Sequence, residues 1–478
     1  MRTGPNATGR VGPRSARAAV RPRARGGAGR EPAPAPRPAA PAAPAVPRAS
    51  SPAVRALASR VAETPEAQLP ALLDEFWRDV ERRGGTPLIE AVDGDPASRA
   101  VTFLWRGHRA TRQVLLLVNG LADRVLPQAL NSVRAGETPS ADALLAPLPG
   151  TDVWHLTYRL GSDHRASYRI AADLSPGDVP TSPETQRLRL RALSPYATRD
   201  PLNTRNMEAC WGLPDASVLA LPDAPAQPWV ERRDDIPRGR VERHRLPAGA
   251  LGEERNVWAY LPPGGPRPDS PVVVLCDGDV WFGPLAFQDT LDALVADGAV
   301  PPPVVLAPDA VDLDIRWRDL TCRDEFVGFL ADELLPWAAG RWPLTADPAR
   351  TVVAGQSLGG LTALYAALLR PERFGAVLAQ SVSLWWRPGL PPGVPELVSD
   401  GTTPWLAERF TDGTPRPALR VHLDVGRHEG VMVDHSRLMH ETLATHGHAV
   451  TRTEYNGGHD YACWRGGLAD GLVNLAAR

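Results

Sequence analysis

A serine at position 357 has the surroundings of a nucleophile. It lies in the string Gly-Gln-Ser-Leu-Gly at 355–359. The residues before it, 351–354, are apolar or β-branched and predict a short buried strand, and the Ala- and Leu-rich residues 358–369 predict a helix. A serine in such a tight strand-to-helix turn needs small neighbours, because its backbone is strained and packs closely. The turn presents the hydroxyl to the positive end of a helix. An ordinary strand–helix turn is the alternative interpretation.

A serine hydroxyl is a poor nucleophile and needs a general base. His459 is the best candidate, because it follows the last predicted strand on the loop Asn-Gly-Gly-His-Asp at 456–460. A glycine-containing loop can bring the imidazole over the serine. The order Ser, acid, His along the chain is that of α/β-hydrolases. A solvent-exposed loop histidine is the alternative.

The acid of the triad is expected just after the strand that precedes the histidine strand. Glu429 lies on that loop, where a carboxylate can receive the imidazole N–H and fix its tautomer. Asp424, on the strand itself, is the second candidate, and Asp434 is placed as a helix cap. A surface carboxylate remains an alternative for each of them.

Two backbone N–H groups are expected to bind the oxyanion of a tetrahedral intermediate. One is the N–H of Leu358, directly after the serine. The other is expected from the loop at 277–281, where we assign Asp279. A simple turn is the alternative for this Asp-Gly-Asp string.

The pattern along the chain divides it into four parts. Residues 1–57 are an Arg-, Pro-, Ala- and Gly-rich tail that we expect to be disordered, and residues 176–237 form an irregular connector. Between them, 58–175 holds a helix and strands at 100–107, 111–120, 152–161 and 165–172, which predict a small β-sandwich domain. Residues 238–478 alternate strands and helices, which predicts an α/β-hydrolase domain: a mostly parallel sheet with helices on both faces. The strands are expected at 256–263, 270–278, 302–310, 350–356, 374–382, 419–426 and 449–458, and the helices at 323–341, 358–369, 433–446 and 464–476.

Composition excludes several classes of function. The formal net charge of −2 gives no reason to expect nucleic-acid binding. No apolar run approaches the roughly 20 residues of a membrane span, and the tail lacks the apolar core of a secretory signal. The 4 cysteines are far apart and show neither zinc-ligand spacing nor disulfide density. These features predict a cytoplasmic protein with free thiols, no metal site and no obligate protein partner.

Several strings resemble the enterochelin (enterobactin) esterases, which hydrolyse iron–siderophore complexes with an esterase-D-like domain. They include Trp385-Trp386, the Cys-Trp-Arg that follows the histidine, and Asp-Pro-Leu-Asn at 200–203. The resemblance covers residues 60–478. It implies Ser357 as nucleophile, His459 as base and Glu429 as acid. It also implies hydrolysis of the trilactone esters of an iron-loaded catecholate siderophore in the cytoplasm, with no cofactor beyond the iron that arrives on the substrate.

Flat, multiply charged catecholates favour contacts with arginine and tryptophan. The resemblance further places Arg316 and Asp319 in the segment that this family uses near its substrate. The candidate substrate-binding residues are Trp281, Arg316, Trp385, Trp386 and Arg465, with Trp464 as a weaker candidate. Core tryptophans and surface ion pairs are the alternatives.

Two other functions stay open. A carbohydrate esterase of feruloyl or acetyl type shares the catalytic domain, but its substrates lie outside the cell and no export signal is evident. A non-catalytic siderophore-binding protein is the other alternative, against which the intact Ser and His motifs argue.

Overall fold

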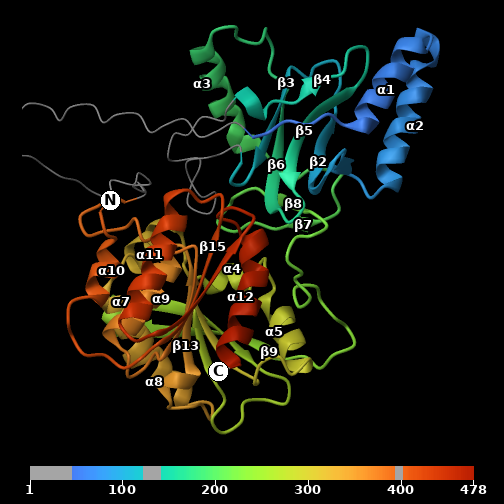
Figure 1. Ribbon diagram of the computed structural model, residues 1–478. Helices are drawn as coiled ribbons and strands as arrows, with labels where there is room; N and C mark the ends of the chain where they lie inside the picture. Colours follow the sequence, from blue (N-terminus) through green and yellow to red (C-terminus); the bar gives the residue numbers. More distant parts are fainter. Residues whose placement is uncertain (1–45, 122–140, 393–401, 478) are drawn as a thin grey trace, which may run out of the picture. The chain divides into compact units, whose positions relative to one another are not determined.

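The computed structural model describes residues 46–121, 141–392 and 402–477 (Figure 1). Its first elements are two helices, α1 (Pro52–Glu63) and α2 (Leu69–Arg82), joined by a 3₁₀ turn at Glu66–Gln68. The Ser51 hydroxyl caps α1 by accepting the Val54 N–H at 3.2 Å. Helix α1 therefore begins within the predicted tail of 1–57, whose residues 1–45 lie outside the described part of the chain. Apolar residues of α1 pack on α2, so this short amphipathic pair belongs to the folded domain.

Two four-stranded antiparallel sheets follow, with strand orders β1-β2-β5-β4 and β3-β6-β8-β7. Their inward-facing side chains share one apolar core, which includes Phe103 of β2, Leu116 of β3, Tyr158 of β5 and Tyr168 of β6. This confirms the predicted sandwich. The strands are β1 (Leu88–Val92), β2 (Asp95–Arg106), β3 (Gln113–Val118), β4 (Ala146–Pro147), β5 (Val153–Gly161), β6 (Arg165–Asp173), β7 (Asn206–Met207) and β8 (Ala216–Ala220).

The predicted connector, 176–237, contains part of this sandwich. It holds helix α3 (Pro183–Leu193) and strands β7 and β8, of which β8 pairs with β6. The Asp-Pro-Leu-Asn string anchors it: the Asp200 carboxylate accepts the hydroxyls of Thr86 and Tyr168 at 2.5 and 2.8 Å, and Asn203 Nδ2 donates to Tyr168 Oη at 3.0 Å. Strand β8 was not predicted from the sequence, because it is only five residues long and lies among Pro- and Asp-rich loops.

The esterase-like half is an eight-stranded sheet with the order β16-β15-β14-β13-β11-β12-β10-β9. The run from β16 to β12 is parallel, and β10 and β9 join it antiparallel. This confirms the α/β prediction. The strands are β9 (Arg240–Ala248), β10 (Glu253–Leu261), β11 (Val272–Leu275), β12 (Val304–Pro308), β13 (Thr351–Gln356), β14 (Ala376–Gln380), β15 (Arg420–Gly426) and β16 (Ala449–Tyr455).

Helices cover both faces of this sheet (Figure 1). Alternate side chains of β11 enter different cores: Val272 and Val274 pack with α9, whereas Val273 and Leu275 pack with α5 and α12. This two-residue alternation is why a buried parallel strand is apolar throughout. The helices are α4 (Gly278–Trp281), α5 (Phe287–Ala296), α6 (Leu313–Leu320), α7 (Asp324–Gly328), a π-helical turn (Phe329–Leu334), α8 (Leu335–Ala339), α9 (Leu358–Leu369), α10 (Trp405–Phe410), α11 (Val431–Thr445) and α12 (Tyr461–Ala476).

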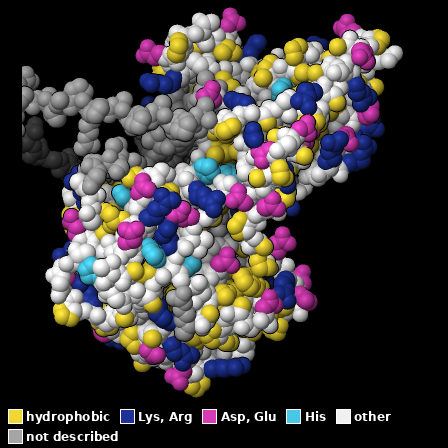
Figure 2. All heavy atoms as spheres, viewed as in Figure 1, with side chains coloured by type: hydrophobic (Ala, Val, Ile, Leu, Met, Phe, Trp, Pro, Cys, Tyr) yellow, Lys and Arg dark blue, Asp and Glu magenta, His cyan; other side chains and the backbone are white. Residues whose placement is uncertain are grey.

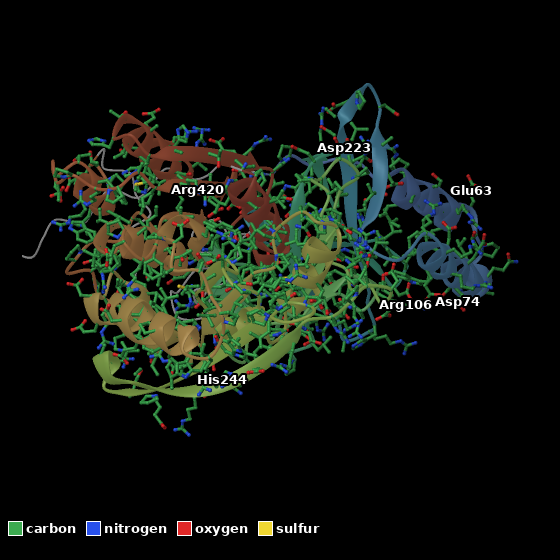
Figure 3. The ribbon with its side chains drawn as sticks, turned by 90° about the horizontal axis from the view of Figure 1, so that it is seen from below. Glu63, Asp74, Arg106, Asp223, His244 and Arg420 are labelled. Atoms are coloured by element: carbon green, nitrogen blue, oxygen red, sulfur yellow. The ribbon has the colours of Figure 1, made fainter. Side chains whose placement is uncertain are left out.

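The surface carries both signs of charge across the face drawn in Figure 2, in keeping with a net charge near zero. Many of these charges are paired. Arg106, at the end of β2, lies 3.0 Å from Asp74 of α2 and ties that helix to the sheet (Figure 3). None of the helices in the described part of the chain has the length and apolar character needed to cross a bilayer.

Candidate active site

Ser357 occupies a strained turn between β13 and α9, with φ of 58° and ψ of −118°. Positive φ is costly for a serine, so the surrounding structure must hold it there. Its N–H donates to Gln380 O at 2.9 Å. A Cβ on Gly355 would lie 2.4 Å from the carbonyl carbon of Gly359, and a Cβ on Gly359 would lie 3.1 Å from Cys276 Cβ. Strand and helix therefore approach closely enough that only glycine fits at 355.

His459 and Glu429 are joined by a hydrogen bond of 2.7 Å between Nδ1 and Oε2. The carboxylate is itself fixed, because its Oε1 accepts the Gly426 N–H at 2.6 Å and the Ser381 hydroxyl at 2.7 Å. Both side chains are almost completely buried. The arrangement places the imidazole proton on Nδ1, which leaves Nε2 as the basic atom. Nε2 has no hydrogen-bond partner among the described residues.

The hydroxyl of Ser357 lies 3.0 Å from Ser383 Oγ. No hydrogen bond joins Ser357 to His459, although both side chains belong to the described part of the chain. Resting enzymes often hold such catalytic contacts loosely and tighten them on the substrate. The structure thus brings the predicted base and acid together and leaves the nucleophile bonded to a second buried serine.

Asp424, the second candidate for the acid, does not contact the histidine. Its Oδ2 accepts Gln380 Nε2 at 2.7 Å, and helix α12 covers it at Gly467, where a Cβ would lie 2.5 Å from the same oxygen. Burial, with the nearby charge of Glu429, raises the pKa of Asp424 to about 8. It is therefore mostly protonated at neutral pH, when a triad acid must carry charge.

The two predicted oxyanion donors follow two adjacent strands, β13 and β11, at the same edge of the sheet. Leu358 is the first residue of α9, where a backbone N–H has no partner within the helix. Asp279 follows β11, which pairs with β13 at Leu275 and Ala354. The Asp279 carboxylate accepts Trp211 Nε1 at 2.8 Å and the Ala310 N–H at 2.9 Å, which fixes the backbone of this loop.

Arg316 was predicted to bind substrate. In the structure its side chain bonds to Asp277, which follows β11, and to Gln356, which precedes Ser357. It forms a bidentate ion pair with Asp277, at 2.8 Å from Nε to Oδ1 and 2.7 Å from Nη2 to Oδ2. Nη2 also donates to Gln356 O at 3.3 Å. The pair is fully buried. Burial alone would lower the pKa of Arg316, but the charge and hydrogen bonds of Asp277 outweigh it and raise that pKa. Asp319 is likewise engaged by Arg255, Arg318 and Arg323.

The tryptophans predicted to bind substrate are buried. Trp281 has no exposed surface and donates its Nε1 to Gln356 at 2.9 Å, so it is a core residue. Trp385 and Trp386 pack against Trp317 and Trp405 and keep only 5% and 9% of their surface exposed. The sequence positions of these tryptophans were compatible with a core residue or with a substrate contact, because a sequence does not show which way a loop side chain points.

Two other predicted contacts have different partners. Trp464 packs its ring edge against His459, with 4.5 Å between centroids, and donates to Ser381 Oγ at 2.8 Å. It therefore supports both the base and, through Ser381, the acid. Arg465 donates to Gln227 Oε1 at 3.3 Å, and burial lowers the pKa of its guanidinium.

A pocket beside His459 was not predicted. It has a volume of about 80 Å³, and its lining includes His459 and Tyr461 of the carboxy-terminal half and Trp211 and Arg169 of the amino-terminal half. Trp211 lies within the predicted connector, where it is one of two tryptophans, with Trp229, among Pro, Asp and Arg residues. Ser381 and Ser383 were missed as well, although they lie four and two residues before Trp385, the first of the two predicted tryptophans.

No group of three or more His, Cys, Asp or Glu side chains in the described ranges is arranged to hold a metal ion. All four cysteines are described and are free thiols.

Comparison with known proteins gives matches along most of the chain. Residues 100–230 match the amino-terminal domain of enterochelin esterases, and residues 248–475 match the Esterase family. The iron(III) enterobactin esterase of Dickeya dadantii is 36% identical, over 84% of this chain and 92% of that protein. The iron(III) salmochelin esterase of Escherichia coli is 35% identical, over 84% of this chain and 93% of that protein.

Solved structures agree with these sequence matches. Ferric enterobactin esterase from Salmonella typhimurium aligns with a TM-score of 0.69 at 31% identity, over 83% of this chain and 98% of that one. Enterobactin esterase from Shigella flexneri, crystallised in the presence of enterobactin, aligns with a TM-score of 0.68 at 30% identity, over 84% and 97%.

Proposed function

The chain belongs to the enterochelin esterase family, and on this premise we propose that it hydrolyses the ester bonds of an iron-loaded catecholate trilactone through Ser357, His459 and Glu429. The observation that carries the proposal is the 2.7 Å bond from His459 to Glu429, which leaves the imidazole Nε2 without a partner, together with the strained strand–helix elbow that holds Ser357. That is the arrangement which acyl transfer at a serine requires.

In the proposed reaction the Ser357 hydroxyl leaves Ser383 and turns to His459 Nε2. The imidazole takes its proton as the oxygen attacks the ester carbonyl, and the Glu429 carboxylate stabilises the imidazolium that forms. The N–H groups of Leu358 and Asp279 receive the oxyanion. His459 then gives this proton to the departing alkoxide oxygen of the scaffold, which leaves as a hydroxyl. Water next gives a proton to the imidazole as it attacks the acyl-enzyme, and the imidazole returns that proton to Ser357 Oγ.

The substrate's iron is cargo in this proposal, and the steps above use no resident metal or organic cofactor. Cutting the ring of a trilactone removes the preorganisation that holds three catecholates on one metal, so the affinity for iron falls. The pocket beside His459 suits one catecholate ring, because an indole, that of Trp211, and a positive guanidinium, that of Arg169, are among its lining groups.

We also propose a cytoplasmic location. The four free cysteines support it, because a reducing compartment keeps thiols unpaired. A carbohydrate esterase and a non-catalytic binding protein are not favoured, since the relatives matched over most of the chain are iron–siderophore esterases.

Product analysis tests this function. Purified protein is incubated with an iron-loaded catecholate trilactone, and the products are identified by mass spectrometry. We expect the linear trimer and shorter fragments, and no product from Ser357→Ala, which should still bind the substrate as measured by tryptophan fluorescence. Unchanged trilactone with the wild-type protein, or faster turnover of a feruloyl ester, would contradict the proposed substrate.

A further inference from the structure

We infer that Asn119, at the end of strand β3 in the amino-terminal sandwich, is a positioning residue for the catalytic base. Its side-chain Nδ2 donates to the backbone carbonyl of His459 at 3.0 Å, across 340 positions of sequence. The inference deepens the proposed function and rests on it for the role of His459. It assigns the sandwich a part in the chemistry itself, in addition to any contact with substrate.

Asn119 is held firmly enough to act as a support. It is 4% exposed, and its own N–H donates to Ser167 O of strand β6 at 3.0 Å. The amide therefore projects from a paired region of the sheet and reaches the loop that carries the histidine.

The approach of the two backbones is close at this point. A Cβ on Gly458, next to the histidine, would lie 2.4 Å from Asn119 Oδ1 and 3.0 Å from Gly120 Cα. A Cβ on Gly120 would lie 3.1 Å from Gly458 Cα, and Gly120 has a φ of 74°. Two glycines, one from each half, are therefore needed for the amide to reach the carbonyl.

Strand β6 holds the same loop on either side of the histidine. The Arg165 N–H donates to Asn456 O at 3.0 Å, before the histidine, and the Ser167 N–H donates to the Asp460 carboxylate, after it. The other oxygen of Asp460 caps helix α12 by accepting the Ala462 N–H at 2.9 Å. The histidine loop is thus fixed at Asn456, His459 and Asp460 by backbone or side-chain groups of the sandwich.

The base needs this support because the Nε2 side of its ring has no hydrogen bond to hold it. Glu429 fixes Nδ1, and Trp464 packs against the ring, while Nε2 must stay free to meet the serine. The position of the ring can therefore be fixed further only through the backbone of His459. A displacement of the order of 1 Å at a catalytic group costs about 100-fold in rate.

Two substitutions remove the amide donor and keep the size of the side chain: Asn119→Leu and Asn119→Asp. We expect kcat to fall about 10- to 100-fold. Because Asn119 also lines the pocket proposed for a catecholate ring, KM is allowed to change for the trilactone, and the positioning effect is measured as kcat on the p-nitrophenyl ester. The matched control is Arg427→Ala. It removes an exposed ion pair with Asp163, 3.3 Å long, that also joins the two halves, and its kcat should stay within about 2-fold of wild type.

The assay uses both the iron-loaded trilactone and a p-nitrophenyl ester, with thermal melting to show which variants are folded. A folded Asn119→Leu with wild-type kcat on the p-nitrophenyl ester would overturn the inference, and so would an equal loss in Arg427→Ala. If the wild type cleaves only the p-nitrophenyl ester and Asn119→Leu slows that reaction, the proposed substrate fails and the role of Asn119 stands. Where Asn119→Leu does not fold, Asn119→Asp gives the decisive comparison. Where neither folds, the amide is a folding requirement and the positioning role is rejected.

Discussion

The turn that carries the nucleophile and the loop that carries the base are supported in different ways. The Ser357 turn is fixed by residues within a few positions and by the neighbouring strands, such as Gly355, Gly359 and Gln380. The His459 loop is fixed by Asn119, Arg165 and Ser167, about 300 positions earlier in the chain. In the proposed catalytic pair, the position of the serine therefore depends on the esterase sheet alone, and the position of the histidine depends on a second domain.

The largest effect is expected from damage to the local turn. In Gly355→Val the added side chain would collide with the Gly359 backbone, and its Cβ alone lies 2.4 Å from an existing carbon. We expect loss of all esterase activity and destabilisation by more than about 4 kcal/mol. Thermal melting and activity assays check this.

Gly328→Ala is the matched control for Gly355→Val. Gly328 lies on helix α7, and a Cβ there would meet nothing within 4 Å, so alanine should be tolerated. A well-folded, active Gly355→Val would show that the turn does not require glycine.

Next in size is the effect of neutralising the acid. Glu429→Gln keeps the shape of the side chain but loses the charge that fixes the imidazole tautomer, so kcat should fall about 10³- to 10⁴-fold. Asp424→Asn is the control, because Asp424 is mostly protonated at neutral pH and bonds to Gln380. Its kcat should stay within about 3-fold of wild type. Equal losses in the two variants would reopen the choice of acid.

A third variant separates core from substrate contact. Trp281→Leu empties part of a core that has no exposed surface at this position. We expect destabilisation by about 2 to 4 kcal/mol, with little change in KM for the siderophore. A raised KM in a protein of unchanged melting temperature would restore Trp281 as a substrate residue.

The last prediction concerns pH, and its effect is a gradual one that is spread over several pH units. The folded-state pKa of Asp424 is about 8, far above the unfolded value, so the native state binds a proton that the unfolded state has released between roughly pH 4 and 8. Stability from this group therefore decreases as pH rises through that window, by up to about 1.4 kcal/mol per pH unit. Melting temperatures from pH 5 to 8 should fall more steeply for wild type than for Asp424→Asn. Parallel slopes would contradict the raised pKa.

The sequence allowed the fold of both halves to be predicted and the proposed nucleophile and base to be chosen, because each depends on local pattern. Ser357 has its glycines beside it, and the strands of the esterase half alternate with helices. The direction of individual side chains could not be predicted. Arg316 and Trp281 lie close to the proposed site in the structure, but Arg316 forms a buried ion pair with Asp277 and Trp281 packs in the core.

Contacts between distant segments were equally out of reach. Nothing near Asn119 distinguishes it from any asparagine at the end of a strand, and its role follows only once the histidine loop is placed against it. Ser383 and the pocket residue Trp211 were missed for the same reason.

The most direct test of the catalytic assignment is covalent labelling of the resting protein with a fluorophosphonate, followed by peptide mass spectrometry. The predicted result is one phosphonylated residue, Ser357, with labelling that slows sharply in Glu429→Gln. Modification of Ser383, whose oxygen lies 3.0 Å away, or the absence of any labelled serine would contradict the account.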